Sequence, residues 1–407
     1  MGIENPIPKD SAGESPEASP ATADPAKSPL RSVHTTSFAQ IVDRLSASLA
    51  VTTYQAGKLV LLRAEQGPQG AVINTHFRAF VKPMGFAYEP GRFALGTNAE
   101  VWEFHDMPAV ARKLDTPESP ARHDAAFLPR TAHITGDVQI HEMVWTAPAK
   151  SATHGKRGMS KLWFVNTRFS CLATRSGLFN FVPRWKPRFI SALAPEDRCH
   201  LNGVALRDGK VRYVTALGET DTPAGWRDNK RSGGVLIDLV SDEIVVRGLS
   251  MPHSPRWHDG RLWVLDSGSG GVGVVDEQSG KYREICRLPG FTRGLDFAGP
   301  YALVGLSQVR ESAVFSGIAI AEMKQEDRCC GVWIIDTRSG QIVGFVKFVE
   351  GVQEIFAVQV LRGLRWPEVL NEDPKRIAES YELPDKALRL VPAGLRQSAN
   401  DAGDRKK

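Results

Sequence analysis

Histidines, carboxylates and an arginine begin several short apolar segments of this sequence, and such residues suit metal binding or acid–base chemistry. Three of the ten histidines stand at such positions, namely His141, His200 and His253. The other polar residues at comparable positions are Glu142, Asn202, Arg293 and Glu354. Imidazole together with carboxylate suits zinc, iron, manganese or copper better than calcium, which prefers oxygen ligands. We therefore predict that His141, His200 and His253 bind a divalent metal ion.

The residues beside these histidines have predicted roles in catalysis. Glu142 or Glu354 would be a metal ligand or a general base. Arg293 would hold a carboxylate or stabilise developing negative charge. Asn202 would position the substrate or complete the coordination.

A second group of polar residues follows the next apolar segment of each unit. These predicted substrate-binding residues are Asn166, Arg168 and Asp266. Asp266 could also orient a metal-binding histidine. The alternative is that the Asp and Asn residues only form turns, for which they are common before Gly or Ser.

Two readings of the histidine cluster need no metal. His, Asn and Glu could form a polar plug in which they hydrogen-bond one another and ordered water. Alternatively, Arg293 binds an anionic substrate while a histidine acts as acid or base. All three readings require the elements to bring distant residues together.

The elements that would do so recur along the chain. The clearest copy lies between His253 and Ile285 and contains the turn HDG, the apolar runs RLWVLD and GGVGVVD, and the turn EQSG. Related copies begin near residues 83, 140, 200 and 292, and a last apolar segment follows Glu354. Turn-separated strands that return at such intervals predict an all-β fold, a six-bladed β-propeller. In a propeller the first strand of each blade lines the axis, so the residues that begin these strands would meet there.

The last segment has no further strands after it, so it needs partners from elsewhere. The apolar segments AVTTYQAGKLVLLRA and GAVINTHF near the N-terminus supply them. We therefore predict a ring closed by N- and C-terminal strands, which removes exposed sheet edges.

Three regions follow from composition. Residues 1–36 are rich in Pro, Ser, Ala and acidic residues and predict a disordered tail. Residues 37–372 would form the propeller, with a short helix over residues 37–48. Residues 373–407 form a polar tail that is expected to contain a short helix.

Charge and hydropathy exclude several classes of protein. The formal net charge of +5 is spread among acidic residues, without the basic stripe that nucleic-acid binding requires. No apolar run approaches the roughly 20 residues that cross a bilayer, and the N-terminus lacks a secretory signal. The five cysteines form no CxxC pair, which favours reduced thiols. We expect a cytoplasmic protein that binds neither nucleic acid nor membrane.

Three stretches carry a resemblance to a known family. They read RCHLNGVALRDGKVRYVTALGETD, SMPHSPRWHDGRLWVLDSGSG and GFTRGLDFAGPYALVGLSQVRE. They resemble an uncharacterised bacterial family of conserved proteins over about residues 36–370, which implies a propeller and no assigned reaction. More distantly, HLNGVALRDGKVRYV is similar to the gluconolactonase and regucalcin propellers, in which an Asn-Gly asparagine binds the axial metal. Asn202 matches that asparagine, but the histidines depart from that family's mostly oxygen site.

The sequence thus favours a propeller enzyme, hydrolase-like or isomerase-like, acting at the axis on a small polar molecule or a peptide. The alternative is a non-catalytic propeller that binds a ligand or a protein partner. Scaffold propellers present unusual residues on outer loops, whereas here they fall at the predicted axis. That position favours a small-molecule site and does not separate binding from turnover.

Overall fold

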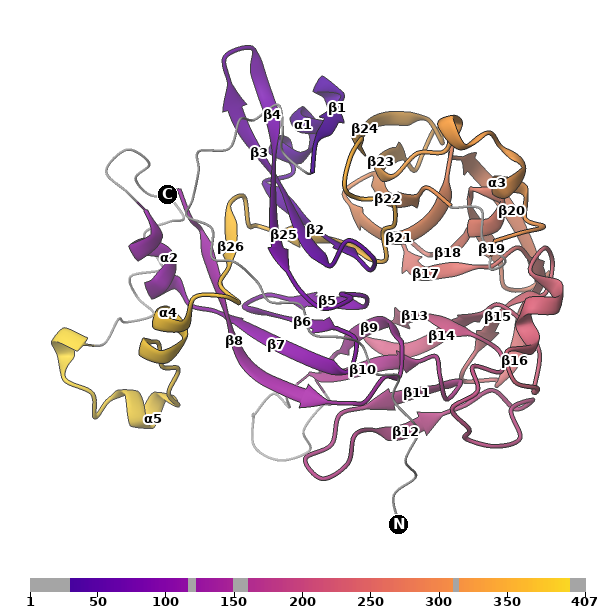
Figure 1. The fold of residues 1–407 in the computed structure, drawn as a ribbon, viewed down its shortest axis with the longest axis horizontal. Helices are drawn as coiled ribbons and strands as arrows, with labels where there is room; N and C mark the ends of the chain where they lie inside the picture. Colours follow the sequence, from indigo (N-terminus) through magenta and orange to yellow (C-terminus); the bar gives the residue numbers. More distant parts are fainter. Residues whose placement is uncertain (1–29, 116–121, 149–159, 310–314, 396–407) are drawn as a thin grey trace, which may run out of the picture.

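Six small sheets surround a common axis in the computed structural model, which describes residues 30–115, 122–148, 160–309 and 315–395 (Figure 1). Each innermost strand contacts the next one around the ring. Their order is β25 (Val358–Arg362), β5 (Phe86–Glu89), β9 (Ile140–Thr146), β13 (Leu201–Arg207), β17 (His253–His258) and β21 (Phe291–Ala298), which returns to β25. The predicted six-bladed β-propeller is confirmed.

The remaining strands complete the blades outward from these six. Blade 1 continues with β2 (Ala47–Thr53), β3 (Lys58–Gly67) and β4 (Gly70–Ala79). Blade 2 continues with β6 (Arg92–Gly96), β7 (Glu100–Asp106) and β8 (Ala125–Ile134), and blade 3 with β10 (Lys161–Asn166), β11 (Cys171–Thr174) and β12 (Val182–Trp185). Blade 4 continues with β14 (Lys210–Ala216), β15 (Gly234–Asp238) and β16 (Glu243–Leu249). Blade 5 continues with β18 (Arg261–Asp266), β19 (Gly271–Asp276) and β20 (Lys281–Arg287), and blade 6 with β22 (Tyr301–Ser307), β23 (Gly331–Asp336) and β24 (Ile342–Phe348).

Local sequence explains the strands and the turns between them. The middle strands are nearly continuous apolar runs, as in β18, where residues 262–265 are all buried. Both faces of such a strand are covered, here by neighbouring blades. The turn before β18 has positive φ at Asp259 and Gly260, 49° and 69°, which is the backbone of a type I′ hairpin turn.

Strands from both ends of the chain close the ring, as predicted. In Figure 1 the yellow β25 lies beside the indigo β2, and Leu49 pairs with Val360 in an antiparallel register. All residues of β2 are buried. The seam between the chain ends is therefore part of the hydrophobic core.

Two further strands were not predicted. β1 (Ser32–His34) pairs with β24, and β26 (Pro367–Val369) pairs in parallel with β8. The expected disorder up to residue 36 is corrected here, because backbone pairing with an edge strand holds a segment with few apolar side chains. Residues 1–29 lie outside the described part of the chain.

Short helices lie outside the blades. The helix expected over residues 37–48 is present as α1 (Thr36–Arg44) but ends earlier, because β2 begins at Ala47, and it packs Phe38 and Ile41 into the core. The others are α2 (Pro108–Leu114), α3 (Ala319–Glu322), α4 (Pro374–Glu379) and α5 (Asp385–Leu388), with 3₁₀ turns at Gly225–Asn229, Ser267–Ser269, Gln325–Asp327 and Ala393–Leu395. The C-terminal segment thus has two short α-helices where one was expected. No helix among the described residues is long and apolar enough to cross a membrane.

Thr52 joins three segments at the seam. Its buried hydroxyl donates to the carbonyl of Met84 at 2.6 Å and accepts from the backbone N–H of Ala357 at 3.0 Å. Its own backbone pairs with Ala357 and Phe356. One side chain therefore links blade 1, the entry to blade 2 and the closing strand.

We expect Thr52→Val to lower the free energy of unfolding by about 2–4 kcal/mol. The isosteric valine leaves a buried carbonyl and a buried N–H without partners, and each such group costs about 1–3 kcal/mol. Thr52→Ser keeps the hydroxyl and should cost only about 1 kcal/mol for the lost methyl. Urea denaturation measures both values. Equal losses in the two variants would show that packing, and not hydrogen bonding, is the function of this residue.

Candidate functional site

The turns that lead into four innermost strands share an unusual backbone. In blades 2 to 5 a residue with left-handed φ precedes the strand: Lys82 (47°), Gln139 (54°), His200 (49°) and Met251 (47°). Residues other than Gly, Asn and Asp seldom adopt this conformation, and such strain concentrates at functional sites. The repeated turn also provides a structural register for comparing the blades.

That register corrects one part of the sequence interpretation. His141 and His253 each lie two residues after the left-handed position, and the matching residue in blade 4 is Asn202. His200 instead occupies the left-handed position itself. The prediction that the three histidines are equivalent is right for two of them and wrong for His200, because backbone conformation cannot be read from residue type.

His141 has a fixed tautomer. Its Nδ1 lies 3.0 Å from the carbonyl oxygen of Gln139 and 2.8 Å from Oγ1 of Thr167. The Thr167 hydroxyl donates to the carbonyl of Leu201 at 2.6 Å, so it faces the ring as an acceptor. Nδ1 must therefore carry the proton, and the Nε2 of neutral His141 has a lone pair.

His253 repeats this arrangement in blade 5. Its Nδ1 lies 2.9 Å from the carbonyl of Met251 and 3.0 Å from Oγ of Ser267. Ser267 follows β18 as Thr167 follows β10. Among the described residues, the Nε2 atoms of His141 and His253 have no hydrogen-bond partner. Both neutral rings thus present a lone pair.

His200 is oriented by a carboxylate. Its Nδ1 lies 2.8 Å from Asp197, and the same Oδ2 accepts the indole N–H of Trp226 at 3.0 Å. Trp226 comes from the insertion between β14 and β15, and its ring centroid is 4.5 Å from that of His200. A carboxylate that fixes the ring and stabilises the imidazolium is the arrangement of a general base. His200 meets His141 edge to face, with ring centroids 4.7 Å apart.

The pKa values of His141 and His253 lie well below the usual range. Burial is the main cause for both rings, and the charges of Arg293 and His200 add to it. Both histidines are therefore neutral at physiological pH, so the Nε2 atom of each ring can accept a hydrogen bond.

These lowered pKa values give a pH dependence to stability. An unfolded histidine has a pKa of about 6.5 and takes up a proton below it, whereas the folded rings stay neutral. The contribution of the two histidines to the free energy of unfolding is therefore fully present above about pH 6.5. Below that pH the free energy of unfolding falls by up to about 1.4 kcal/mol per pH unit for each ring. Urea denaturation of wild type and of His141→Asn at pH 7.5, 6.5 and 5.5 should show about half of this slope lost in the variant. An unchanged slope would contradict the assignment.

Arg293 is the buried cation of the cluster. Its side chain is 9% exposed, its Cζ lies 3.2 Å from the centroid of Phe356, and Nη1 is 3.6 Å from Glu354. Nη2 is buried without a hydrogen-bond partner in the described structure. Burial lowers the pKa of Arg293 to about 10, opposed by Glu354, so it stays charged at neutral pH. The guanidinium has donor capacity that the protein leaves unused.

The two predicted catalytic glutamates have different surroundings. Glu142 accepts the backbone N–H of Val204 at 2.7 Å and forms an ion pair with Arg256, so it ties blade 3 to blade 4. Glu354 lies beside Arg293 and is partly exposed, with 18% of its side chain accessible. Both carboxylate oxygens of Glu142 are thus engaged by protein groups, whereas Glu354 lies beside the buried cation.

The predicted substrate-binding residues hydrogen-bond mainly to the protein itself. Asn202 donates to the carbonyl of Pro252 at 3.0 Å and accepts from Thr215 at 2.6 Å. Asn166 accepts the N–H of Phe169 in a turn, and Arg168 pairs with Asp137 at 2.6 Å. Asp266 accepts from Ser250 and Ser269, while burial raises the pKa of its carboxyl. These contacts shape the turns around the histidines.

A metal ion would need some rearrangement of this cluster. Within the described ranges, no three His, Cys, Asp or Glu side chains are grouped so that they could hold a metal ion. The tautomers nevertheless fit one, because metal-binding histidines usually donate from Nδ1 to a carbonyl or carboxylate and bind through Nε2. The metal remains a prediction.

The structure adds residues that sequence analysis did not assign to the site. They are Asp197, Thr167, Ser267 and Phe356. The hydroxyls of Thr167 and Ser267 could have been found, since both follow the second strand of a blade directly. Asp197 lies in a loop and Phe356 precedes the closing strand, so neither had a sequence signal.

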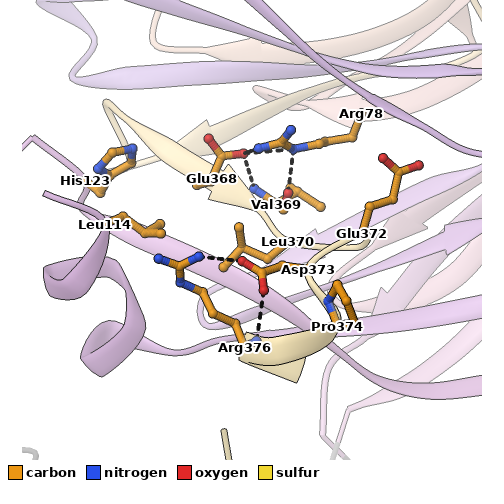
Figure 2. Close-up of a pocket in the computed structure, with 10 residues that line it drawn as sticks. All are labelled: Arg78, Leu114, His123, Glu368, Val369, Leu370, Glu372, Asp373, Pro374 and Arg376. Carbon is orange, nitrogen blue, oxygen red and sulfur yellow. Dashed lines mark hydrogen bonds and ion pairs between the residues drawn. The ribbon is translucent and has the colours of Figure 1, made fainter. Parts of the chain in front are cut away.

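A separate cavity of about 600 Å³ lies at the outer edge of blade 2 (Figure 2). It is lined by residues of β4, α2, β26 and α4 and the segments beside them. Its charged groups pair with one another, Glu368 with Arg78 at 2.8 Å and Asp373 with Arg376 (Figure 2). The Glu368–Arg78 pair joins β26 to β4 of blade 1, whereas the Asp373–Arg376 pair lies within the C-terminal segment itself.

Known structures align with much of this chain at low sequence identity. A chain of a nidogen/laminin complex aligns with 9% identity over 78% of this chain and 99% of that one, with a TM-score of 0.47. A protein of unknown function from Bacteroides caccae gives 10% identity, 78% and 99% coverage and a TM-score of 0.44. The virginiamycin B lyase of Staphylococcus aureus gives 11% identity, 79% and 99% coverage and a TM-score of 0.36.

A search of curated proteins found no match. A family model matches residues 36–370, which contain all six blades and the axial cluster, and it is described as a domain of unknown function, DUF4915. Since this match covers most of the sequence, the chain belongs to the DUF4915 family.

Proposed function

We propose that the axial cluster binds a small polar molecule and transfers a proton to or from it. One observation carries the proposal: His200 pairs with Asp197 and its ring packs edge to face on that of His141, whose pKa is lowered in part by the nearby charge of Arg293. A general base, neutral acceptors and a buried cation are the parts that proton-transfer catalysis requires.

The chemistry assigns a role to each group. Nε2 of His200 takes a proton from an O–H or C–H bond of the substrate, and Asp197 stabilises the resulting imidazolium. The electron pair stays on the substrate, where Arg293 stabilises the negative charge. Return of the proton to another substrate atom is isomerase-like, whereas removal of a proton from water is hydrolase-like.

A divalent metal ion bound by His141, His200 and His253 is the second candidate. The observation in its favour is that all three Nδ1 atoms already donate to oxygen, so all three Nε2 atoms are available as ligands. Zinc, iron or manganese would suit these nitrogens better than calcium. Metal analysis of purified protein tests it. Equal, sub-stoichiometric metal in wild type and in the three His→Ala variants would reject the site.

Incubation in D₂O tests for proton transfer without a known substrate. The purified protein is mixed with a library of small polar molecules and peptides, and mass spectrometry follows deuterium uptake and product formation. We expect at least one compound to react with wild type and not with His200→Gln, which cannot act as a base. His133→Gln makes the same change of residue type in β8, the outer part of blade 2, where the ring hydrogen-bonds to the carbonyl of Asn180, and it serves as the control.

A result with bound compounds but no reaction would contradict the catalytic proposal. The protein would then be a non-catalytic ligand-binding propeller. A protein partner that binds wild type and His200→Gln equally would instead indicate a scaffold.

A further inference from the structure

We propose that the ligand of the axial cluster is a small molecule that carries both a carboxylate or similar oxyanion and a hydrogen-bond donor, as 2-hydroxy and 2-amino acids do. This inference rests on the proposed function and names its substrate class. It follows from matching the unused donors and acceptors of the cluster to a ligand.

The anionic half of the ligand is matched by Arg293. Phe356 covers one face of the guanidinium at 3.2 Å, so the remaining donors lie in the guanidinium plane. Nη2 is buried and unpaired within the described structure, and Glu354 at 3.6 Å is too distant for a good hydrogen bond to Nη1. A buried, unpaired donor on a cation is unfavourable, and a planar oxyanion relieves it by accepting from the fork.

The donor half is matched by the imidazoles. The Nδ1–H groups of His141 and His253 are used by backbone carbonyls and hydroxyls, so each ring offers only the Nε2 lone pair. The Nδ1–H of His200 is likewise used by Asp197. An acceptor-rich surface of this kind pairs with hydroxyl or ammonium groups and gains nothing from carbonyl or ether oxygens.

Phe356 links the two halves in space. Its ring contacts the Arg293 guanidinium, and its centroid lies 5.2 Å from that of His141. Arg293 and His141 therefore lie around the same aromatic ring. An anion that pairs with Arg293 and a donor that reaches His141 can belong to one small molecule.

Four nearly isosteric probes separate the two halves. Lactate and alanine carry both the carboxylate and a donor, propionate lacks the donor, and lactamide lacks the charge. We measure dissociation constants by ligand-observed NMR. Lactamide loses a hydrogen bond between charged groups, so we expect it to bind at least about ten-fold more weakly than lactate or alanine. Propionate loses a neutral hydrogen bond relative to lactate, so we expect it to bind about three- to ten-fold more weakly than lactate.

Variants connect this preference to the residues. Arg293→Gln should weaken lactate or alanine binding at least about ten-fold and leave lactamide unchanged. The matched control is Arg287→Gln, which alters an exposed ion pair with Glu284 in blade 5. The comparison of the four probes on wild type needs no variant, so it decides the question even if Arg293→Gln does not fold.

Each outcome has a defined meaning. Preference for lactate indicates a hydroxy acid, and preference for alanine an amino acid. Propionate binding as tightly as lactate would overturn the donor half, and lactamide binding as tightly would overturn the anionic half. If none of the four binds while the D₂O screen finds another substrate, this inference fails and the proposed function stands. If lactate or alanine binds and nothing reacts, the inference stands and catalysis fails.

Discussion

Gly294→Ala is expected to lower the free energy of unfolding by about 4 kcal/mol, because two costs coincide at this residue. Gly294 has φ of +82°, which costs a side-chain-bearing residue about 1–2 kcal/mol. A Cβ there would also lie 2.6 Å from the backbone N of Val358 and 2.9 Å from the carbonyl carbon of Ala357. Overpacking against backbone adds about 1–3 kcal/mol. The clash falls where blade 6 meets the closing strand of blade 1.

Gly299→Ala is the matched control for this substitution. Gly299 also has positive φ, +56°, and lies in the β21–β22 turn of the same blade, but a Cβ there meets no atom within 4 Å. Gly299→Ala should lower the free energy of unfolding by only about 1–2 kcal/mol, the cost of a left-handed backbone for alanine. Urea denaturation of both variants checks the difference. Similar losses would show that the seam tolerates the extra methyl and that the backbone conformation alone determines the cost.

Glu368→Gln is expected to cost about 3–5 kcal/mol at neutral pH, the usual price of breaking a buried ion pair. Glu368 lies 2.8 Å from both His76 and Arg78 and 3.7 Å from Arg63. Arg63 is itself buried, so the substitution would leave a cation without its carboxylate. Burial alone would raise the pKa of Glu368, but His76 and Arg78 outweigh it and lower the pKa to about 2.

The pH dependence distinguishes this charge effect from packing. The folded pKa lies below the unfolded value of about 4.3, so the contribution of Glu368 is complete above pH 4.3 and is lost as the pH falls toward 2. Wild type and Glu368→Gln should therefore converge in stability at acidic pH. Glu350→Gln, at an exposed pair with Arg31, should change stability by less than about 1 kcal/mol at any pH. A difference that persists at pH 2 would contradict the ion-pair explanation.

The parts of the fold that side-chain patterns specify were predictable, and the parts held by backbone pairing alone were not. Apolar runs separated by Asp-Gly and similar turns are local patterns, so the blades and the closure by both chain ends could be predicted. β1 and β26 could not, because they are held by backbone pairing to an edge strand, which leaves no side-chain pattern. Conversely, the short helix α1 was predictable, since its apolar residues Phe38, Ile41 and Val42 follow helical spacing.

Although Glu354 precedes β25 by four residues and is not part of it, the recurring apolar runs and turns sufficed to predict a propeller with His141, His253 and Arg293 in innermost strands. This is so because strand periodicity and turn chemistry are local properties of the chain. The chemical properties of these residues depend on the folded protein. His200 occupies the left-handed turn position itself, two residues before the position that His141 and His253 share. Loops bring Asp197 and Trp226 to the His200 region, where Asp197 accepts hydrogen bonds from His200 and Trp226. Burial leaves Nη2 of Arg293 without a hydrogen-bond partner in the described structure. Those properties depend on contacts between segments far apart in the sequence, which residue types and spacing do not record.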